Sequence, residues 1–167
     1  HTLGNPLERS RSPRQIGAEL YGHAGSTSDL EVIQLMLEML AVSGIQTVHL
    51  DLGHVGIYRE LSLQAGLTAQ QESELFTLLQ GKAKTELTEL VKSYPIAEPF
   101  KVMLLKLIEL NGGADILQKA KAVLAQANDK VKQALNELQA IADQLAVLFP
   151  ALPIHFDLAE LRGYHYH

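Results

Sequence analysis

A long run of helical sequence, residues 54–148, lies between two strand-like segments and most constrains how this chain can fold. The segment before it, residues 45–52, alternates apolar and polar side chains, which predicts a half-buried strand ended by Gly53. The segment after it, residues 154–158, returns to strand character behind Pro150 and Pro153. Helices placed between two strands predict an α+β fold in which a helical insertion interrupts a sheet.

Breaks in the periodicity divide the helical run into separate helices. Glycine, proline and asparagine favour helix ends and turns. They break the pattern at Gly66, Gly81, Tyr94-Pro95, Asn111-Gly112-Gly113 and Asn128. We interpret Gly112-Gly113 as a turn rather than as a phosphate-binding loop. The predicted helices are residues 54–65, 68–80, 82–93, 98–110, 113–126 and 128–148, and the last carries an apolar stripe at 3.6-residue spacing.

The first part of the chain predicts a loop, a strand and a helix. Residues 1–14 contain Gly, Pro and Arg without any period, which is typical of an exposed loop. Residues 15–22 alternate and predict a short strand. The residues Ser26-Thr27-Ser28-Asp29 supply N-cap chemistry for a helix that ends at Gly44. One face of that helix is apolar: Leu30, Ile33, Leu37, Leu40 and Ala41.

These elements predict a mostly antiparallel sheet with helices. We assign residues 1–53 to the sheet-bearing core, residues 54–150 to the helical insertion, and residues 151–167 to a strand that returns to the core.

Composition and charge exclude several classes of function. The 167 residues suffice for one domain with a hydrophobic core, and a formal net charge of -5 does not favour nucleic-acid binding. The chain has no cysteine, which excludes disulfides and thiolate metal sites. No apolar run reaches the roughly 18–20 residues that span a bilayer, and the first residues lack the order of a signal peptide, so we predict a cytoplasmic protein. Because the chain begins at His1 without Met and stops after Tyr-His-Tyr-His, we expect it to be part of a longer protein.

Gln15 and Glu19 are candidates for binding a small zwitterion. On a strand, positions four apart lie on the same face, so the amide and the carboxylate can meet one ligand. The carboxylate would bind an ammonium group, and the amide would orient it. The alternative is a solvated strand face with two polar residues. In the preceding loop, Arg9, Arg11 and Arg14 are candidates for holding an anion, with a solubilising loop as the alternative.

Seven histidines make a metal site one hypothesis. His165 and His167 would share a strand face, with His155 nearby in the sequence. No carboxylate stands at a recognisable ligand spacing, so we predict no metal site. The chain also lacks a P-loop and a dinucleotide-binding motif, so we predict no cofactor. The other histidines are interpreted as packing or surface residues: His23, His49 and His54.

Arg162-Gly163 is a candidate for a small-ligand pocket with an anionic component. Glycine leaves room for a ligand to approach the backbone, and arginine pairs with carboxylates. Tyr166 and His167 add aromatic walls and hydrogen-bonding groups. A plain strand-and-turn ending is the alternative.

Two segments together resemble the histidyl-tRNA synthetase family, which has the class II aminoacyl-tRNA synthetase fold. The first reads Gln-Ile-Gly-Ala-Glu-Leu-Tyr-Gly (residues 15–22), followed by Asp-Leu-Glu-Val-Ile (29–33). The second reads Leu-Arg-Gly-Tyr-His-Tyr-His (161–167). Arg9-Ser10-Arg11 fits an Arg-x-Arg in a mobile loop of the family. The resemblance implies that Gln15 and Glu19 contact a bound histidine and that residues 54–150 are the insertion found between these motifs.

At two positions the sequence departs from the family pattern and resembles a branch of the family without ligase activity. The histidine-specific segment of the family reads Leu-Val-Arg-Gly-Leu-Asp-Tyr-Tyr, whereas His165 stands in place of its Asp and His167 in place of its final Tyr. These residues and Leu-Asp-Leu-Gly-His-Val at 50–55 resemble the regulatory subunits of ATP phosphoribosyltransferase, a non-catalytic branch with the same fold.

The resemblance implies a regulatory subunit that acts at the first step of histidine biosynthesis. Its partner would be the short-form catalytic subunit, which needs it for activity and for feedback control by histidine. Glu19 would bind the ammonium group of histidine, and Gln15 would orient it. Arg162 would face the carboxylate, and Tyr166 or His167 would bracket the imidazole. We also expect self-association and no membrane contact. A histidine–tRNA ligase and a helical interaction module without a ligand are the alternatives.

Overall fold

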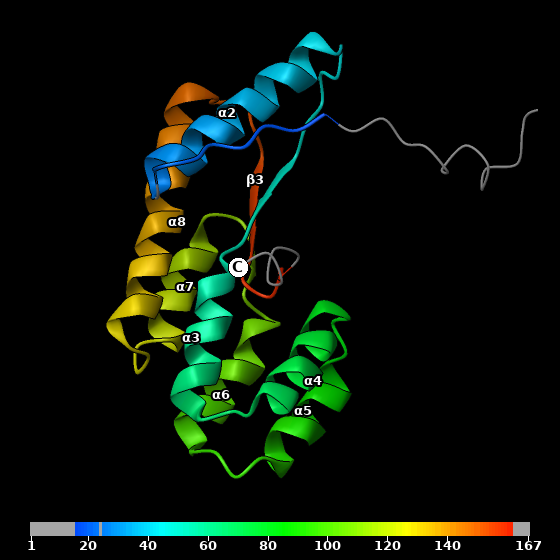
Figure 1. The fold of residues 1–167 in the computed structure, drawn as a ribbon, viewed down its shortest axis with the longest axis vertical. Helices are drawn as coiled ribbons and strands as arrows, with labels where there is room; N and C mark the ends of the chain where they lie inside the picture. Colours follow the sequence, from blue (N-terminus) through cyan, green and yellow to red (C-terminus); the bar gives the residue numbers. More distant parts are fainter. Residues whose placement is uncertain (1–15, 24, 162–167) are drawn as a thin grey trace, which may run out of the picture.

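The computed structural model of the chain describes residues 16–23 and 25–161, in which a small sheet lies beside a set of helices (Figure 1). Its strands are β1 (Leu50–Leu52), β2 (Asn111–Gly112) and β3 (Ile154–Asp157), in the order β1-β3-β2. β3 pairs parallel with β1 and antiparallel with β2. The predicted α+β class is confirmed, but the described sheet is mixed rather than mostly antiparallel. The long helical connection from β1 to β3 permits this parallel pairing.

The helices predicted between the two strands are confirmed. Their observed bounds are α3 Val55–Ala65, α4 Ala69–Gln80, α5 Lys84–Ser93, α6 Glu98–Leu107, α7 Asp115–Val123 and α8 Asp129–Leu148. A capping box between Thr68 and Gln71 begins α4. The side chain of Asn128 begins α8, because it accepts a hydrogen bond from the backbone N–H of Val131 at 3.1 Å. The predicted breaks at Gly66, Gly81, Tyr94 and Asn128 are therefore helix caps, whereas Asn111 and Gly112 form β2.

Two strand predictions need correction. Residues 16–22 form no strand within the described part of the chain; they run along α2 (Ser26–Val42) with exposed side chains (Figure 1). An alternating sequence becomes a strand only where a sheet edge can pair with its backbone, and here the neighbouring element is a helix. β1 covers residues 50–52 instead of 45–52, because its partner β3 begins at Ile154, opposite Leu50.

One predicted turn and one predicted helix cap also differ from the structure. Gly112 belongs to β2 and pairs with Phe156, whereas we expected a turn between helices. A Cβ at Gly112 would lie 2.9 Å from Cγ1 of Ile116, and its φ of 148° favours glycine. α2 begins after Gly25 without a side-chain cap, so the cap predicted at residues 26–29 does not form.

One hydrophobic core joins the helices to the sheet. The apolar stripe of α8 packs against α2, α3 and α7. The predicted members Val131, Leu135, Leu138, Ile141, Ala142 and Leu145 are buried, whereas Leu148 at the helix end is exposed. Figure 1 shows α2 at one end of the molecule and the α4–α5 hairpin at the other. None of the helices in the described ranges is both long and apolar enough to cross a bilayer.

Candidate functional site

The turn after β3 leads directly into the Arg162-Gly163 motif, and its own hydrogen bonds hold it. The carboxylate of Asp157 accepts a hydrogen bond from the backbone N–H of Ala159 at 3.0 Å. The backbone carbonyl of Asp157 accepts another from the N–H of Glu160 at 3.1 Å. An aspartate that bonds the backbone two residues ahead is a common way to fix a tight turn. These hydrogen bonds therefore fix the backbone of the turn that leads to Leu161, which is fully buried.

Two other segments hold the same turn from outside. The backbone N–H of Leu158 donates to the carbonyl of Leu110, just before β2, at 3.0 Å. Gly53, just after β1, packs so close that a Cβ there would lie 2.9 Å from the carbonyl oxygen of Asp157 and 3.1 Å from that of Glu160. A side chain at Gly53 would displace backbone atoms. The glycine in Leu-Asp-Leu-Gly-His-Val thus has a steric role beside this turn.

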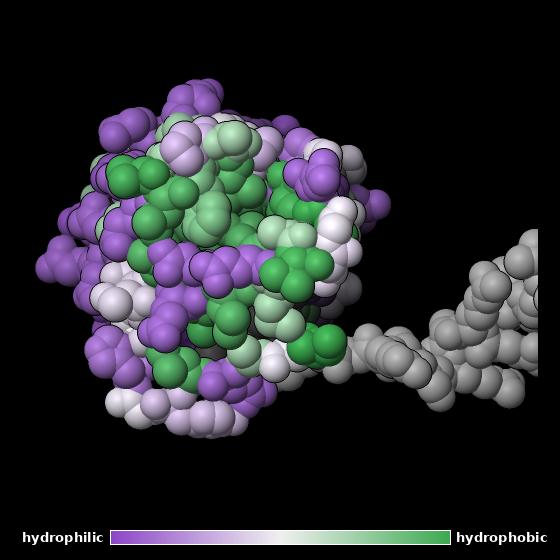
Figure 2. All heavy atoms as spheres, turned by 90° about the horizontal axis from the view of Figure 1, so that it is seen from above, coloured by the Kyte–Doolittle hydropathy of each residue, from purple (hydrophilic) through white to green (hydrophobic). Residues whose placement is uncertain are grey.

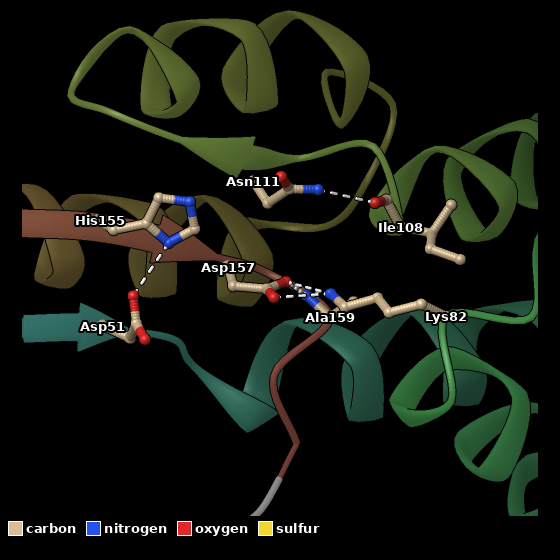
Figure 3. Close-up of polar contacts among 7 residues, drawn as sticks. All are labelled: Asp51, Lys82, Ile108, Asn111, His155, Asp157 and Ala159. Atoms are coloured by element: carbon tan, nitrogen blue, oxygen red, sulfur yellow. Dashed lines mark hydrogen bonds and ion pairs between the residues drawn. The ribbon is translucent and has the colours of Figure 1, made fainter.

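A lysine from the α4–α5 turn completes the support. Nζ of Lys82 lies 2.7 Å from Oδ1 and 2.6 Å from Oδ2 of Asp157 (Figure 3). The side chain of Asp157 is 17% exposed and that of Lys82 is 42% exposed, so the pair is partly shielded from solvent. With Lys82 and the Ala159 N–H as donors, the carboxylate is engaged in structural bonds. Asp157 therefore supports the turn.

The sheet presents a polar face on the side away from the core. Nδ1 of His155 on β3 lies 3.0 Å from Oδ1 of Asp51 on β1, its register partner, and both side chains are exposed (Figure 3). Phe156 lies on the buried face between His155 and Asp157. The described residues contain no cluster of three His, Asp or Glu side chains that could hold a metal ion. His165 and His167 lie outside the described residues.

His54 has a defined role that we did not predict. Its Nδ1 accepts a hydrogen bond from the backbone N–H of Gly56 at 3.1 Å and so caps α3. An accepting Nδ1 places the proton of the neutral ring on Nε2, which lies 3.3 Å from Oε2 of Glu137 on α8. His54 therefore links the start of α3 to α8. Its position after Gly53 and before an apolar helix was the sequence signal for a cap.

Glu19 is the predicted ligand-binding residue that the structure describes. It is exposed and accepts a hydrogen bond from the hydroxyl of Tyr21, and this bond raises the pKa of Tyr21. Its segment runs beside a groove of about 390 Å³ between residues 16–18 and α2. Apolar side chains line the α2 wall of that groove: Val32, Leu35, Met36, Met39 and Leu40. Such a lining does not suit a zwitterion.

The exposed apolar side chains gather near this end of the molecule. Figure 2 shows them on the face that includes α2. The exposed large hydrophobic residues of α2 and the segment before it are Ile16, Leu20, Tyr21, Leu35, Met36 and Val42.

The described residues do not bring Glu19 to the turn after β3. Segment 16–22 lies beside α2, whereas residues 158–161 follow the opposite end of β3 (Figure 1). The remaining predicted site residues lie outside the described residues: Arg9, Arg11, Gln15, Arg162, Tyr166 and His167. The supporting residues Gly53, Lys82 and Asp157 were missed by the sequence analysis.

Comparison with protein families and curated sequences places the chain among known proteins. The family model described as histidyl-tRNA synthetase matches residues 1–167. A protein of Methylococcus capsulatus named ATP phosphoribosyltransferase regulatory subunit is 54% identical over 99% of this chain and 41% of that protein. A Pseudomonas aeruginosa protein of the same name is 54% identical over 100% of this chain and 42% of that protein. The chain thus spans about two fifths of the length of these relatives.

Solved structures show the same fold. A Bacillus halodurans structure described as an ATP phosphoribosyltransferase regulatory subunit/histidyl-tRNA synthetase has a TM-score of 0.70 at 28% identity, covering 83% of this chain and 36% of that chain. The ATP phosphoribosyl transferase (HisG:HisZ) complex from Thermotoga maritima has a TM-score of 0.61 at 18% identity, covering 87% of this chain and 49% of that chain. The second likeness concerns the fold alone. The class II synthetase-like fold expected from the sequence is confirmed.

Proposed function

The chain belongs to the histidyl-tRNA synthetase family, and we propose that its protein acts in the cytoplasm as a regulatory subunit of ATP phosphoribosyltransferase, at the first step of histidine biosynthesis. The observation that carries this proposal is the 54% identity to a curated regulatory subunit over 99% of this chain. His165 and His167 support it, since they replace an Asp and a Tyr of the histidine-specific segment of the ligases. We propose no catalytic step for this protein.

The proposed partner is the catalytic subunit of ATP phosphoribosyltransferase. The solved complex from Thermotoga maritima, whose matched chain has this fold, supports a hetero-oligomer. To test the pairing, the full-length protein is mixed with a tagged short-form catalytic subunit, and co-elution and transferase activity are measured. We expect a stable complex with activity that the catalytic subunit lacks alone. Separate elution with no gain in activity would contradict the proposal.

The proposed regulatory ligand is histidine. Glu19 would bind its ammonium group with Gln15 beside it, and Arg162 would face its carboxylate. Tyr166 and His167 would bracket the imidazole. The exposure of Glu19 supports this role, since its carboxylate is open to a ligand. The turn at residues 157–161 also supports it, because a fixed approach to Arg162 reduces the entropy lost on binding.

This pocket requires segment 16–22 and the end of β3 to approach each other in the complete protein. Segment 16–22 makes few inward contacts, because each of its residues is exposed, so a shift of this segment costs little packing. A distance measurement between spin labels at positions 20 and 160 of the full-length protein tests the approach. We expect the distance to shorten and its distribution to narrow when histidine is added. A long distance that histidine does not change would contradict the pocket.

Calorimetry tests the ligand groups. Histidine is titrated into the full-length protein, its Glu19→Gln and Arg162→Met variants, and Glu31→Gln as a matched control on exposed α2 surface. A charge-assisted hydrogen bond contributes about 1.5–3 kcal/mol, so each site variant should weaken binding roughly 10- to 150-fold. The control should bind like the wild type. Undiminished binding by the double variant Glu19→Ala, Arg162→Ala would rule out this pocket.

Two details of the proposal concern organisation and regulation. We propose that residues 54–150 are an insertion between core segments 1–53 and 151–167. The insertion and these segments share one hydrophobic core, because α8 packs against α2. We also propose self-association of the full protein. If histidine favours one arrangement of the assembly, the coupling is expected to be about 1–3 kcal/mol.

A histidine–tRNA ligase is the second candidate, because the matching family model carries that description. A ligase forms histidyl-adenylate, so it catalyses histidine-dependent exchange of pyrophosphate into ATP. We expect no such exchange with the full-length protein. Exchange at a rate well above background, without activation of the transferase, would favour the ligase. Complex formation that is insensitive to histidine would favour a helical interaction module.

A further inference from the structure

The helix α2 carries apolar side chains on two opposite sides. One side holds Leu30 and Leu37, which are buried in the core. The other side, here called the outer face of α2, has apolar residues at the spacing i, i+3, i+7 and i+10. An α-helix turns by about 100° per residue, so this spacing places the outer face opposite Leu30 and Leu37. The outer face consists of Val32, Leu35, Met36, Met39 and Val42.

A helix that is apolar on both sides is typical of an element packed between two layers. In the described structure only one layer is present. Leu35 and Met36 on the outer face are each 41% exposed, and Val42 is 90% exposed. Apolar surface of this extent on one face marks a place where another polypeptide packs.

Residues 16–18 cover the outer face only in part. They run beside α2 and leave a groove of about 390 Å³, which they line together with Val32, Leu35 and residues further along the helix. Ile16 in this wall is itself 79% exposed. Figure 2 shows apolar side chains gathered on the face of the molecule that includes α2. The groove and the outer face therefore form one apolar surface that is open to a further partner.

The charge of α2 argues against a second copy of the same surface as that partner. The helix contains Asp29, Glu31 and Glu38, which are all exposed, and it contains no Lys or Arg. In a symmetric dimer the same patch meets itself, so these carboxylates would approach one another. The surface instead fits an apolar partner with basic side chains at its rim.

The length of the relatives indicates where such a partner surface comes from. Two regulatory subunits match 99% and 100% of this chain, but only 41% and 42% of their own lengths are matched. More than half of each relative therefore lies outside the matched part. A surface on the same polypeptide reaches α2 at a higher effective concentration than a separate protein does.

We propose that the outer face of α2 is an internal interface of the full-length protein, covered by a part of the same polypeptide that lies outside residues 1–167. The covering part presents apolar side chains with basic residues at their rim. α2 then lies between two layers, with α8 on one side and the covering part on the other. This inference does not depend on the proposed histidine site, because histidine binding takes no part in it.

The methionines test the cover in the full-length wild-type protein without any substitution. Met36 on the outer face is 41% exposed, whereas Met103 on α6 is 2% exposed and serves as the buried reference. The protein is treated with dilute hydrogen peroxide, and the oxidation rate of each methionine is measured by mass spectrometry. Because oxidation follows exposure, we expect Met36 to react within about 3-fold of the rate of Met103. A faster reaction of Met36 would overturn the inference.

Photo-crosslinking identifies what covers the outer face. A photoreactive benzoylphenylalanine replaces Leu35 in the full-length protein, and the matched control carries it in place of Leu63, which is 63% exposed on α3. Isotopically light and heavy protein are mixed, so that cross-links within one chain differ in mass from those between chains. We expect position 35 to capture a segment of the same chain outside residues 1–167. Capture of that segment to the same extent from position 63 would overturn the inference, because it would not be specific to α2.

The remaining outcomes assign the surface to another occupant and overturn the inference. Cross-links between chains, with Met36 protected only at concentrations where the protein self-associates, would assign it to a second copy. Protection that appears only after the catalytic subunit is added would assign it to that subunit. Cross-links from position 35 to another part of residues 1–167 would place the cover within this chain. Each of these results leaves the proposed histidine site to be judged by its own calorimetry.

Discussion

Replacing Gly53 with alanine tests the close approach between the end of β1 and the turn after β3. The added Cβ would lie 2.9 Å from the carbonyl oxygen of Asp157 and 3.1 Å from that of Glu160. These are backbone atoms, and the carbonyl of Asp157 is itself held by the N–H of Glu160. The turn therefore cannot move away from the added Cβ without losing a hydrogen bond. The clash must be relieved by a shift of β1 or by opening of the turn.

The size of the effect follows from two opposing contributions. Forcing an extra methyl group into a packed site costs about 1–3 kcal/mol. Alanine restricts the unfolded chain more than glycine does, which stabilises the folded state by about 0.4–1 kcal/mol. We expect Gly53→Ala to lower the free energy of unfolding by about 1–2 kcal/mol, measured by urea unfolding followed by circular dichroism. For a chain of this size the melting temperature should fall by roughly 2–8 °C.

Gly17→Ala is the matched control for this measurement. No atom lies within 4 Å of a Cβ built at Gly17, and its φ is outside the left-handed range. We expect that variant to change the free energy of unfolding by less than about 0.5 kcal/mol. If Gly53→Ala is as stable as Gly17→Ala, the two backbones do not approach as the structure shows, and the support assigned to the 157–161 turn is refuted.

Two further predictions concern helix ends and charge. His54→Ala should lower the free energy of unfolding by about 1 kcal/mol, because the α3 cap is lost. His54→Asn can still accept a hydrogen bond from the N–H of Gly56, so it should retain most of that free energy in the same urea assay. If both variants lose the same free energy of unfolding, His54 does not act as a cap. Hydrogen bonds from Lys106 and, second, Lys84 lower the pKa of Glu109 to about 2. Because this pKa is below the ordinary 4.5, the stabilisation is complete above about pH 4.5 and is lost as the pH falls towards 2. Glu109→Gln should therefore flatten the stability curve in that window, and a slope equal to that of the wild type would contradict the ion pairs.

Sequence periodicity predicted the helices because its causes are local. The breaks at Gly66 and Asn128 act within one helix turn, so their chemistry could be recognised without knowing the fold. Strands depend on distant partners. β1 is limited to the residues opposite β3, and residues 16–22 lack a described sheet edge, so alternation alone overestimated both segments.

The support for the candidate site was hidden from the sequence for the same reason. Lys82 follows Gly81 at a helix end, where a lysine usually extends into solvent, and its partner lies 75 residues away. Gly53 was visible as a strand end, but its steric role depends on the turn at residues 157–160. The ligand motifs were recognised by resemblance, whereas the residues that hold them depend on tertiary contacts.

The engagement of Asp157 restricts how histidine can be recognised. An ammonium group needs a carboxylate, and the one closest in sequence to Arg162 on β3 already accepts hydrogen bonds from Lys82 and Ala159. Freeing it would open the turn that leads to Arg162, so a ligand could not recruit Asp157 without disturbing the approach to its own arginine. Glu19, the proposed ammonium partner, lies outside the turn and is exposed, so it can bind a ligand without disturbing the hydrogen bonds of Asp157. The calorimetric and distance measurements on Glu19 therefore decide whether the proposed pocket exists.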